Sequence, residues 1–166
     1  MALSLSGDGT LSGVDIAASG LGKVLQVVRA TDSTDRSTTS TSFVDVTGMS
    51  VTITPTKNTS AVLIVAICNL VHYNSSVNET YGRLQITDSS NNAISGAETT
   101  LFGVQNYTRS GTAETGTNAI VWGYATPATT SAVTYKLRFL SRLSTTTSLL
   151  LNGFQTGQLF AIEVAA

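Results

Sequence analysis

The chain has 166 residues, the usual size of one domain, with a formal net charge of −1 and a pI near 5.7. Charged residues make up only 11 % of it, which excludes the clustered Lys and Arg that nucleic-acid binding requires. The longest apolar run, Ala61 to Cys68, is far shorter than the ~20 residues of a membrane-spanning helix, so we also expect no membrane partner.

Residues 1–22 differ from the rest of the chain in being rich in glycine, with apolar side chains spaced among polar ones. These apolar residues are Leu3, Leu5, Leu11, Val14 and Ile16. Such a segment cannot build its own core, but it can order on a partner surface. It also lacks the basic and the continuous apolar regions of a secretory signal. The sequence predicts an extended docking arm over 1–22 and synthesis in the cytoplasm of a host.

From Lys23 onwards, short alternating segments are bounded by Gly, Pro, Asn and Ser/Thr clusters, and Ser and Thr together make up about 28 % of the chain. No segment has apolar residues at helical spacing. We predict an all-β domain over 23–166, an antiparallel β-sandwich or jelly roll, because the strands recur about every ten residues. The predicted strands are Lys23–Thr31, Phe43–Val46, Val51–Thr54, Ser60–Val71, Tyr81–Thr87, Thr99–Val104, Asn118–Thr126, Val133–Arg142, Ser148–Asn152 and Gln158–Val164.

The loops between these strands have the composition of turns. Asp32 to Ser42 is a hydroxyl-rich loop without apolar residues, and Gly48 marks a turn between two short strands. Asn74 to Asn78 and Gln105 to Thr117 are further loops, and Asp88 to Asn92 is a turn cluster of Asp, Ser and Asn.

The strands differ in how many of their faces are apolar. In Val133 to Arg142, Lys136 and Arg138 alternate with aromatic and aliphatic residues, which predicts one buried and one solvated face. In Ser60 to Val71 both faces are apolar, and the same holds for Asn118 to Thr126 and Gln158 to Val164.

A monomeric two-sheet sandwich covers only the inner faces of its sheets, so a second copy is the economical cover for an apolar outer face. The alternatives are a closed barrel or a covering loop within one chain. The residues that we expect on the self-association face are Val62, Ile64, Ala66, Trp122, Tyr124, Phe160 and Ile162.

The sequence offers few parts for catalysis. The lone His72 ends a predicted strand, where we expect a surface or loop-edge imidazole, and the lone Cys68 lies in an apolar run, where we expect a small buried hydrophobe. The closest carboxylate pair, Asp32 and Asp35, has the spacing of solvated turn formers. We therefore expect no enzyme, no metal site and no cofactor.

Several motifs in the stretch from Gly7 to Ala66 resemble virion proteins of tailed phages, cyanophages among them. The motifs are GDGTLSG at 7–13, GKVLQVV at 22–28, and a Thr/Ser loop that leads to SFVDV at 42–46 and TITPT at 52–56. The resemblance implies a surface β-protein of the fibre, tailspike or capsid decoration class, and such proteins are typically β-sandwich trimers.

The short arm favours one class within this resemblance, because the tail members carry longer N-terminal shafts. We expect a homotrimeric capsid decoration (cement) protein on the outer capsid surface of the virion. Its arm would dock on the phage major capsid protein and stabilise the shell.

Two other hypotheses belong to different classes. The first is a receptor-binding tail-fibre tip that recognises a host surface glycan by stacking on Tyr73, Tyr81 and Tyr107. The simpler interpretation of these rings is packing at the rim between strands. The second is a glycan-cleaving tailspike, which would need a carboxylate pair in a groove.

Overall fold

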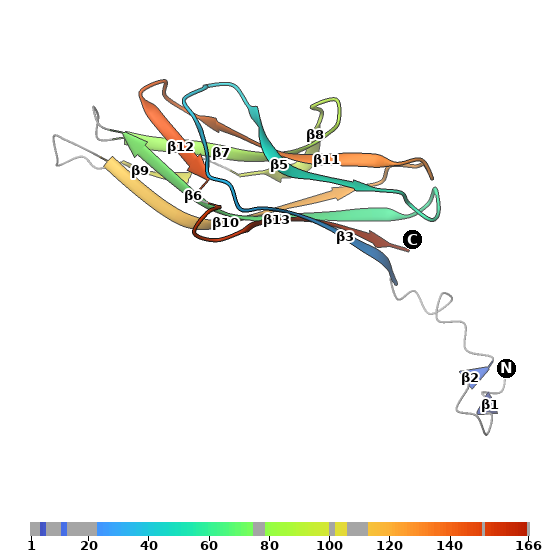
Figure 1. The fold of residues 1–166 in the computed structure, drawn as a ribbon. Coiled ribbons are helices and arrows are strands. Elements are labelled where there is room, and N and C mark those ends of the chain that lie inside the picture. The colour runs from blue at the N-terminus through green and yellow to red at the C-terminus, as the bar shows by residue number, and fades with distance from the viewer. Residues whose placement is uncertain are drawn as a thin grey trace.

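The computed structural model describes residues 4–5, 11–12, 23–74, 79–99, 102–105, 113–150 and 152–165 (Figure 1). Every regular element in these ranges is a strand, which confirms the prediction of an all-β chain. Within the same ranges, no helix is long and apolar enough to cross a membrane. The strands are β1 (Ser4–Leu5), β2 (Leu11–Ser12), β3 (Val24–Asp32), β4 (Arg36–Thr38), β5 (Val44–Ile53), β6 (Ala61–Asn74), β7 (Glu79–Asp88), β8 (Ala93–Glu98), β9 (Phe102–Gln105), β10 (Ala113–Ala125), β11 (Val133–Ser141), β12 (Thr146–Leu150) and β13 (Gly157–Val164).

Two antiparallel sheets lie face to face, as Figure 1 shows, and this confirms the predicted β-sandwich. Sheet I contains β3, β13, β6, β12, β4 and β10, with β6 at its centre. One edge of β6 pairs with β13 and then with β12, and its other edge pairs with β10 along thirteen residues. Sheet II contains β5, β11, β7 and β8 in that order, with β9 beside β7.

The core fills the space between the sheets, and alternation along each strand decides which residues enter it. From sheet II, β11 contributes Tyr135, Leu137 and Phe139, while its Lys136 and Arg138 lie on the outer face. The prediction of one buried and one solvated face for this strand is confirmed. The largest fully buried side chains of the core are Met49, Ile53, Ile64, Leu70, Leu84, Ile86, Leu137 and Leu159.

The predicted break in β5 is wrong: a single strand runs from Val44 to Ile53. Gly48 has a φ of +91°, and the pairing with β11 shifts register between Lys136 and Arg138, so the glycine forms a bulge within the strand. Between Asp45 and Ser50, β5 has three residues more than the facing part of β11. This irregularity keeps Val46 and Met49 both buried although their spacing would otherwise place them on opposite faces.

Three strands extend into segments that the sequence predicted as loops or left unassigned. β4 lies inside the predicted loop 32–42, β8 follows the Asp88 turn, and β10 begins within the predicted loop 105–117. Their sequences are rich in Ser, Thr, Gly and Asn, so local composition favours turns, and pairing with neighbouring strands overrides it.

The predicted docking arm falls mostly outside the described residues. Leu3, Val14 and Ile16 are outside them, and Leu5 and Leu11 pair with each other as part of the short β1–β2 ladder.

Candidate self-association surface

The outer face of sheet I carries Val27, Ile120, Trp122 and Tyr124, which are exposed large hydrophobic residues in the described part of the chain. Cross-strand partners in a sheet point to the same face, so the register defines which side chains lie together. Three successive rows cross β3, β13, β6 and β10. The rows are Val27–Ile162–Leu63–Tyr124, Arg29–Phe160–Val65–Trp122 and Thr31–Gln158–Ile67–Ile120.

Exposure increases from the middle of this surface towards β10. Val65, at the centre of the grid, is 8 % exposed, because its large cross-strand neighbours Phe160 and Trp122 flank it on the same face. On β10, by contrast, Ile120, Trp122 and Tyr124 are 50 %, 58 % and 60 % exposed. Interface hot spots are enriched in Trp and Tyr, and this exposed ridge of β10 carries one of each. The twelve residues of the grid are hereafter called the sheet I face.

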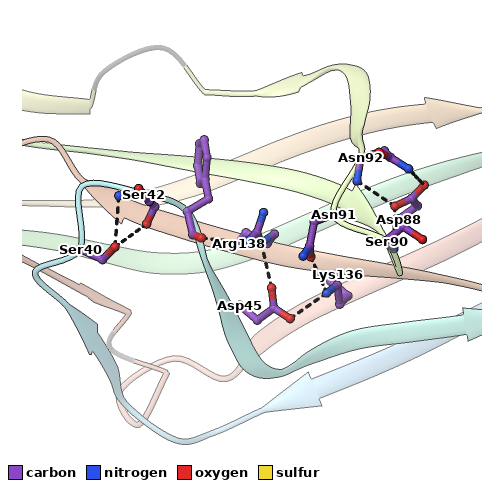
Figure 2. Close-up of polar contacts among 10 residues, drawn as sticks. Ser40, Ser42, Asp45, Asp88, Ser90, Asn91, Asn92, Lys136 and Arg138 are labelled. Atoms are coloured by element: carbon purple, nitrogen blue, oxygen red, sulfur yellow. Dashed lines mark hydrogen bonds and ion pairs between the residues drawn. The ribbon is translucent and has the colours of Figure 1, made fainter.

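The outer face of sheet II has the opposite character, and Figure 2 shows its polar contacts. The Asp45 carboxylate accepts hydrogen bonds from Lys136 Nζ at 2.7 Å and Arg138 Nε at 2.8 Å, which hold its pKa below the ordinary value. Lys136 Nζ also donates to Asn91 Oδ1 at 2.7 Å, and Arg83 pairs with Glu98. Charged groups that pair with one another on a sheet surface suit contact with water. The two outer faces therefore suit different surroundings, solvent for sheet II and an apolar partner for the sheet I face.

The residues predicted for self-association are divided between the two sides of sheet I. Trp122, Tyr124, Phe160 and Ile162 belong to the sheet I face. Val62, Ile64 and Ala66 are fully buried in the core against sheet II, so the placement of these three on an outer face is wrong.

The sequence prediction missed five apolar residues that share the face with the aromatic residues: Val27, Leu63, Val65, Ile67 and Ile120. Ile120 could have been predicted, because residues two apart in a strand lie on the same face and Trp122 was already assigned to this face. Whether Val62 or Leu63 lies on the outer face depends on the register of β6 with β10, which the sequence alone does not give.

The tyrosines of the glycan hypothesis are not gathered on one surface in the described residues. Tyr73 is the penultimate residue of β6 on sheet I and is 38 % exposed. Tyr81 lies on β7 of sheet II, and the Arg142 guanidinium stacks 5.3 Å from the centre of its ring. Tyr107 lies outside the described residues.

The candidate chemical residues occupy structural positions. Cys68 is buried as predicted, and burial raises the pKa of its thiol to about 12. His72 is 1 % exposed, so the prediction of a surface imidazole is wrong; burial lowers its pKa to about 4. Because β6 extends to Asn74, His72 lies within the strand and not at its end. Among the described residues, no group of three or more His, Cys, Asp or Glu side chains is arranged to hold a metal ion.

Asp32 and Asp35 are not a free carboxylate pair. Asp32 is buried at the end of β3 and was wrongly predicted to be solvated; Arg36 Nε lies 3.4 Å from its carboxylate. Burial raises the pKa of Asp32, but hydrogen bonds from Arg36, Thr34 and Asn152 outweigh this effect and lower it. Asp35 accepts a 2.7 Å hydrogen bond from the Gly153 amide. Both carboxylates therefore fasten the loops at one end of the sandwich.

Fold and surface together define a β-sandwich with one solvated and one apolar sheet face. No protein-family model matches the sequence, and a search of curated proteins finds no match. Among solved structures, the chain is similar to a structure of the Gx strain of infectious bursal disease virus, with 13 % identity and a TM-score of 0.32 over 99 % of this chain and 44 % of that one. It is also similar to the VP2 subviral particle of the same virus, with 13 % identity and a TM-score of 0.31 over 100 % of this chain and 42 % of that one. The chain spans less than half the length of these proteins, and likeness at this level does not establish a shared function.

Proposed function

We propose that the protein is a non-catalytic structural subunit that self-associates through the sheet I face. In its specific form, the proposal is a homotrimeric decoration protein on the outer surface of a tailed-phage capsid, with residues 1–22 docking on the major capsid protein. The observation that carries self-association is the contrast between the outer faces of the two sheets. The phage assignment is supported by the motifs between Gly7 and Ala66.

The size of the sheet I face is compatible with part of an obligate interface. The grid spans four strands about 4.8 Å apart and five residues along each strand, which gives an area on the order of 300 Å². A stable interface buries about 800 Å² on each partner. Arg29 is the one charged side chain of the grid. When the grid is buried against a second copy, only this guanidinium needs hydrogen-bond acceptors, and the Gln158 side-chain oxygen already accepts a hydrogen bond from it at 3.5 Å. The remaining area has to come from neighbouring parts of the chain.

The first experiment measures the mass of the protein in solution at micromolar concentration. A trimer has a mass of about 52 kDa, three times the 17.3 kDa of the chain. We expect this mass for the native chain and 17.3 kDa for the double variant Trp122→Ser and Tyr124→Ser. Both side chains lie outside the core, so the variant should keep its fold, which far-UV circular dichroism checks.

The matched control is Phe154→Ser, which removes another exposed aromatic ring. Phe154 is 83 % exposed in the turn between β12 and β13 and is not part of the sheet I face. This variant should keep the mass of the native assembly. A native chain that is monomeric at micromolar concentration, or a double variant that still assembles, contradicts the proposal.

A further inference from the structure

The edge strands of a sheet present unpaired backbone groups, and folded proteins protect them with charges, prolines, bulges or short length. In the described residues, β10 hydrogen-bonds through one edge only, to β6. That pairing is uninterrupted from Ala113 to Ala125, so the strand has no bulge. Residues 115–125 contain no Lys, Arg, Asp, Glu or Pro. β10 is therefore a long, regular and unprotected edge.

The other edge strands described by the structure are protected, with one exception. β4 has three residues and β9 has four. β5 carries the Gly48 bulge, and the pairing of β8 with β7 is irregular, with only two register pairs. The exception is β3, whose pairing with β13 is regular from Gln26 to Asp32. The two long regular edges thus belong to the same sheet, and it is the sheet with the apolar outer face.

The directions of these two strands suit pairing between copies of the chain. Three antiparallel pairings separate β3 from β10 in the order β3, β13, β6, β10, so β3 and β10 run in opposite directions. A second copy related to the first by rotation about an axis parallel to the strands has its own β3 and β10 running in the same directions as in the first copy. The β10 edge of one copy therefore meets the β3 edge of the next in antiparallel orientation, as hydrogen bonding between strands requires. A cyclic trimer needs such a heterologous contact, because two identical edges pair only across a twofold axis.

We infer that the exposed edge of β10 pairs with the β3 edge of a second copy, which joins the sheet I strands of neighbouring protomers into one continuous sheet. This inference rests on the proposed self-association and specifies how it occurs. Edge pairing adds backbone hydrogen bonds and area to the sheet I face, whose own size falls short of a standard interface. It also covers both long regular edges of sheet I, those of β10 and β3.

Backbone amide hydrogen exchange, resolved by residue with NMR, tests the inference on the full-length chain. In an edge strand, alternate amides point away from the sheet and exchange rapidly unless another strand accepts their hydrogen bonds. In the native assembly, we expect the outward amides of both β10 and β3 to exchange at least about a hundredfold more slowly than the outward amides of β8. In the Trp122→Ser and Tyr124→Ser variant, these amides should exchange as rapidly as those of β8.

The mass of the same samples in solution distinguishes a failure of edge pairing from a failure of self-association through the sheet I face. Rapid exchange of the outward amides of β10 or of β3 in a sample with the mass of the assembly overturns edge pairing and leaves association through the sheet I face intact. A monomeric native chain overturns both. Slow exchange in a monomeric double variant also overturns the inference, because the protection would then arise within one chain.

Discussion

At the scale of single residues, Glu163 is a fully buried carboxylate whose partners come from two distant parts of the chain. It is the penultimate residue of β13 and accepts hydrogen bonds from Gln26 Nε2 at 2.6 Å and from the Thr56 amide and hydroxyl at 2.7 and 2.8 Å. These bonds fasten the turn between β5 and β6 to the end of sheet I. Burial raises the pKa of Glu163, but the hydrogen bonds from Gln26 and Thr56 help to outweigh this effect, and the pKa falls to about 2.

We predict that Glu163→Gln lowers the free energy of unfolding at pH 7 by about 2–3 kcal/mol, because buried donors lose a charged acceptor. The pKa of the group is lower in the folded chain than the ordinary 4.5, so its stabilisation is present above pH 4.5 and is lost as the pH falls towards 2. The difference between native chain and variant should therefore shrink in urea titrations as the pH is lowered from 7 to 3.

The control for this prediction is Glu98→Gln, which removes a partly exposed ion pair with Arg83 and should cost less than about 1 kcal/mol. A cost for Glu163→Gln that is the same at pH 7 and pH 3 would show that the lost stabilisation does not depend on the ionised carboxylate.

At the scale of the elements, the bulge of β5 determines which side chains of that strand enter the core. Gly48 combines a positive φ with a close approach to β3: a β-carbon at this position would lie 2.8 Å from Asp32 Cγ. Neither constraint suits an L side chain, and the buried Asp32 is held by Arg36 and Asn152. The register of β5 thus depends on a glycine in the middle of a strand.

Gly48→Ala should therefore destabilise the protein by about 2–3 kcal/mol, measured by denaturant unfolding. Gly96→Ala is the matched control, because Gly96 has a φ of +75° but no atom within 4 Å of an added β-carbon. It isolates the backbone strain, which costs about 1 kcal/mol. Equal costs for the two variants would show that contact with Asp32 has no part in the effect.

At the scale of the whole molecule, the two sheets have different outer surfaces while they share one core. Sheet II places paired charges on its outer face, and sheet I places an apolar grid there with an aromatic ridge on β10. A chain of this kind is suited to a symmetric assembly in which sheet I faces inward. The proposed docking arm, residues 1–22, would then act in several copies at once, and linked weak contacts reinforce one another.

Deletion of residues 1–22 should leave the number of chains in the assembly unchanged and abolish its binding to phage shells, measured by co-sedimentation with shells stripped of the protein. The sandwich strands begin at Val24, so the deletion spares β3. Retained binding would refute the docking role of the arm.

The copy number on the virion distinguishes a decoration protein, which we expect in hundreds of copies, from a fibre tip, which we expect in tens.

Much of the fold follows from residue patterns that hold within single strands. The wet and dry faces of β11 follow from Lys136 and Arg138, and the Asp88 turn follows from its side chain, whose Oδ1 accepts from the Ser90 and Asn92 amides. β4 and β8 could not be predicted in this way, because their Ser, Thr and Gly residues become strands only through pairing.

The sequence by itself determined that β6 is apolar on both faces and that an all-β chain has to cover both. It could not determine which face is the core, because alternation treats Val62 and Leu63 alike. Only the tertiary structure decided this: sheet II packs against Val62, Ile64 and Ala66 and leaves Leu63 on the side of Trp122 and Tyr124. The physical reason is that burial depends on packing between strands that are distant in the sequence, and the pattern within one strand does not contain that information.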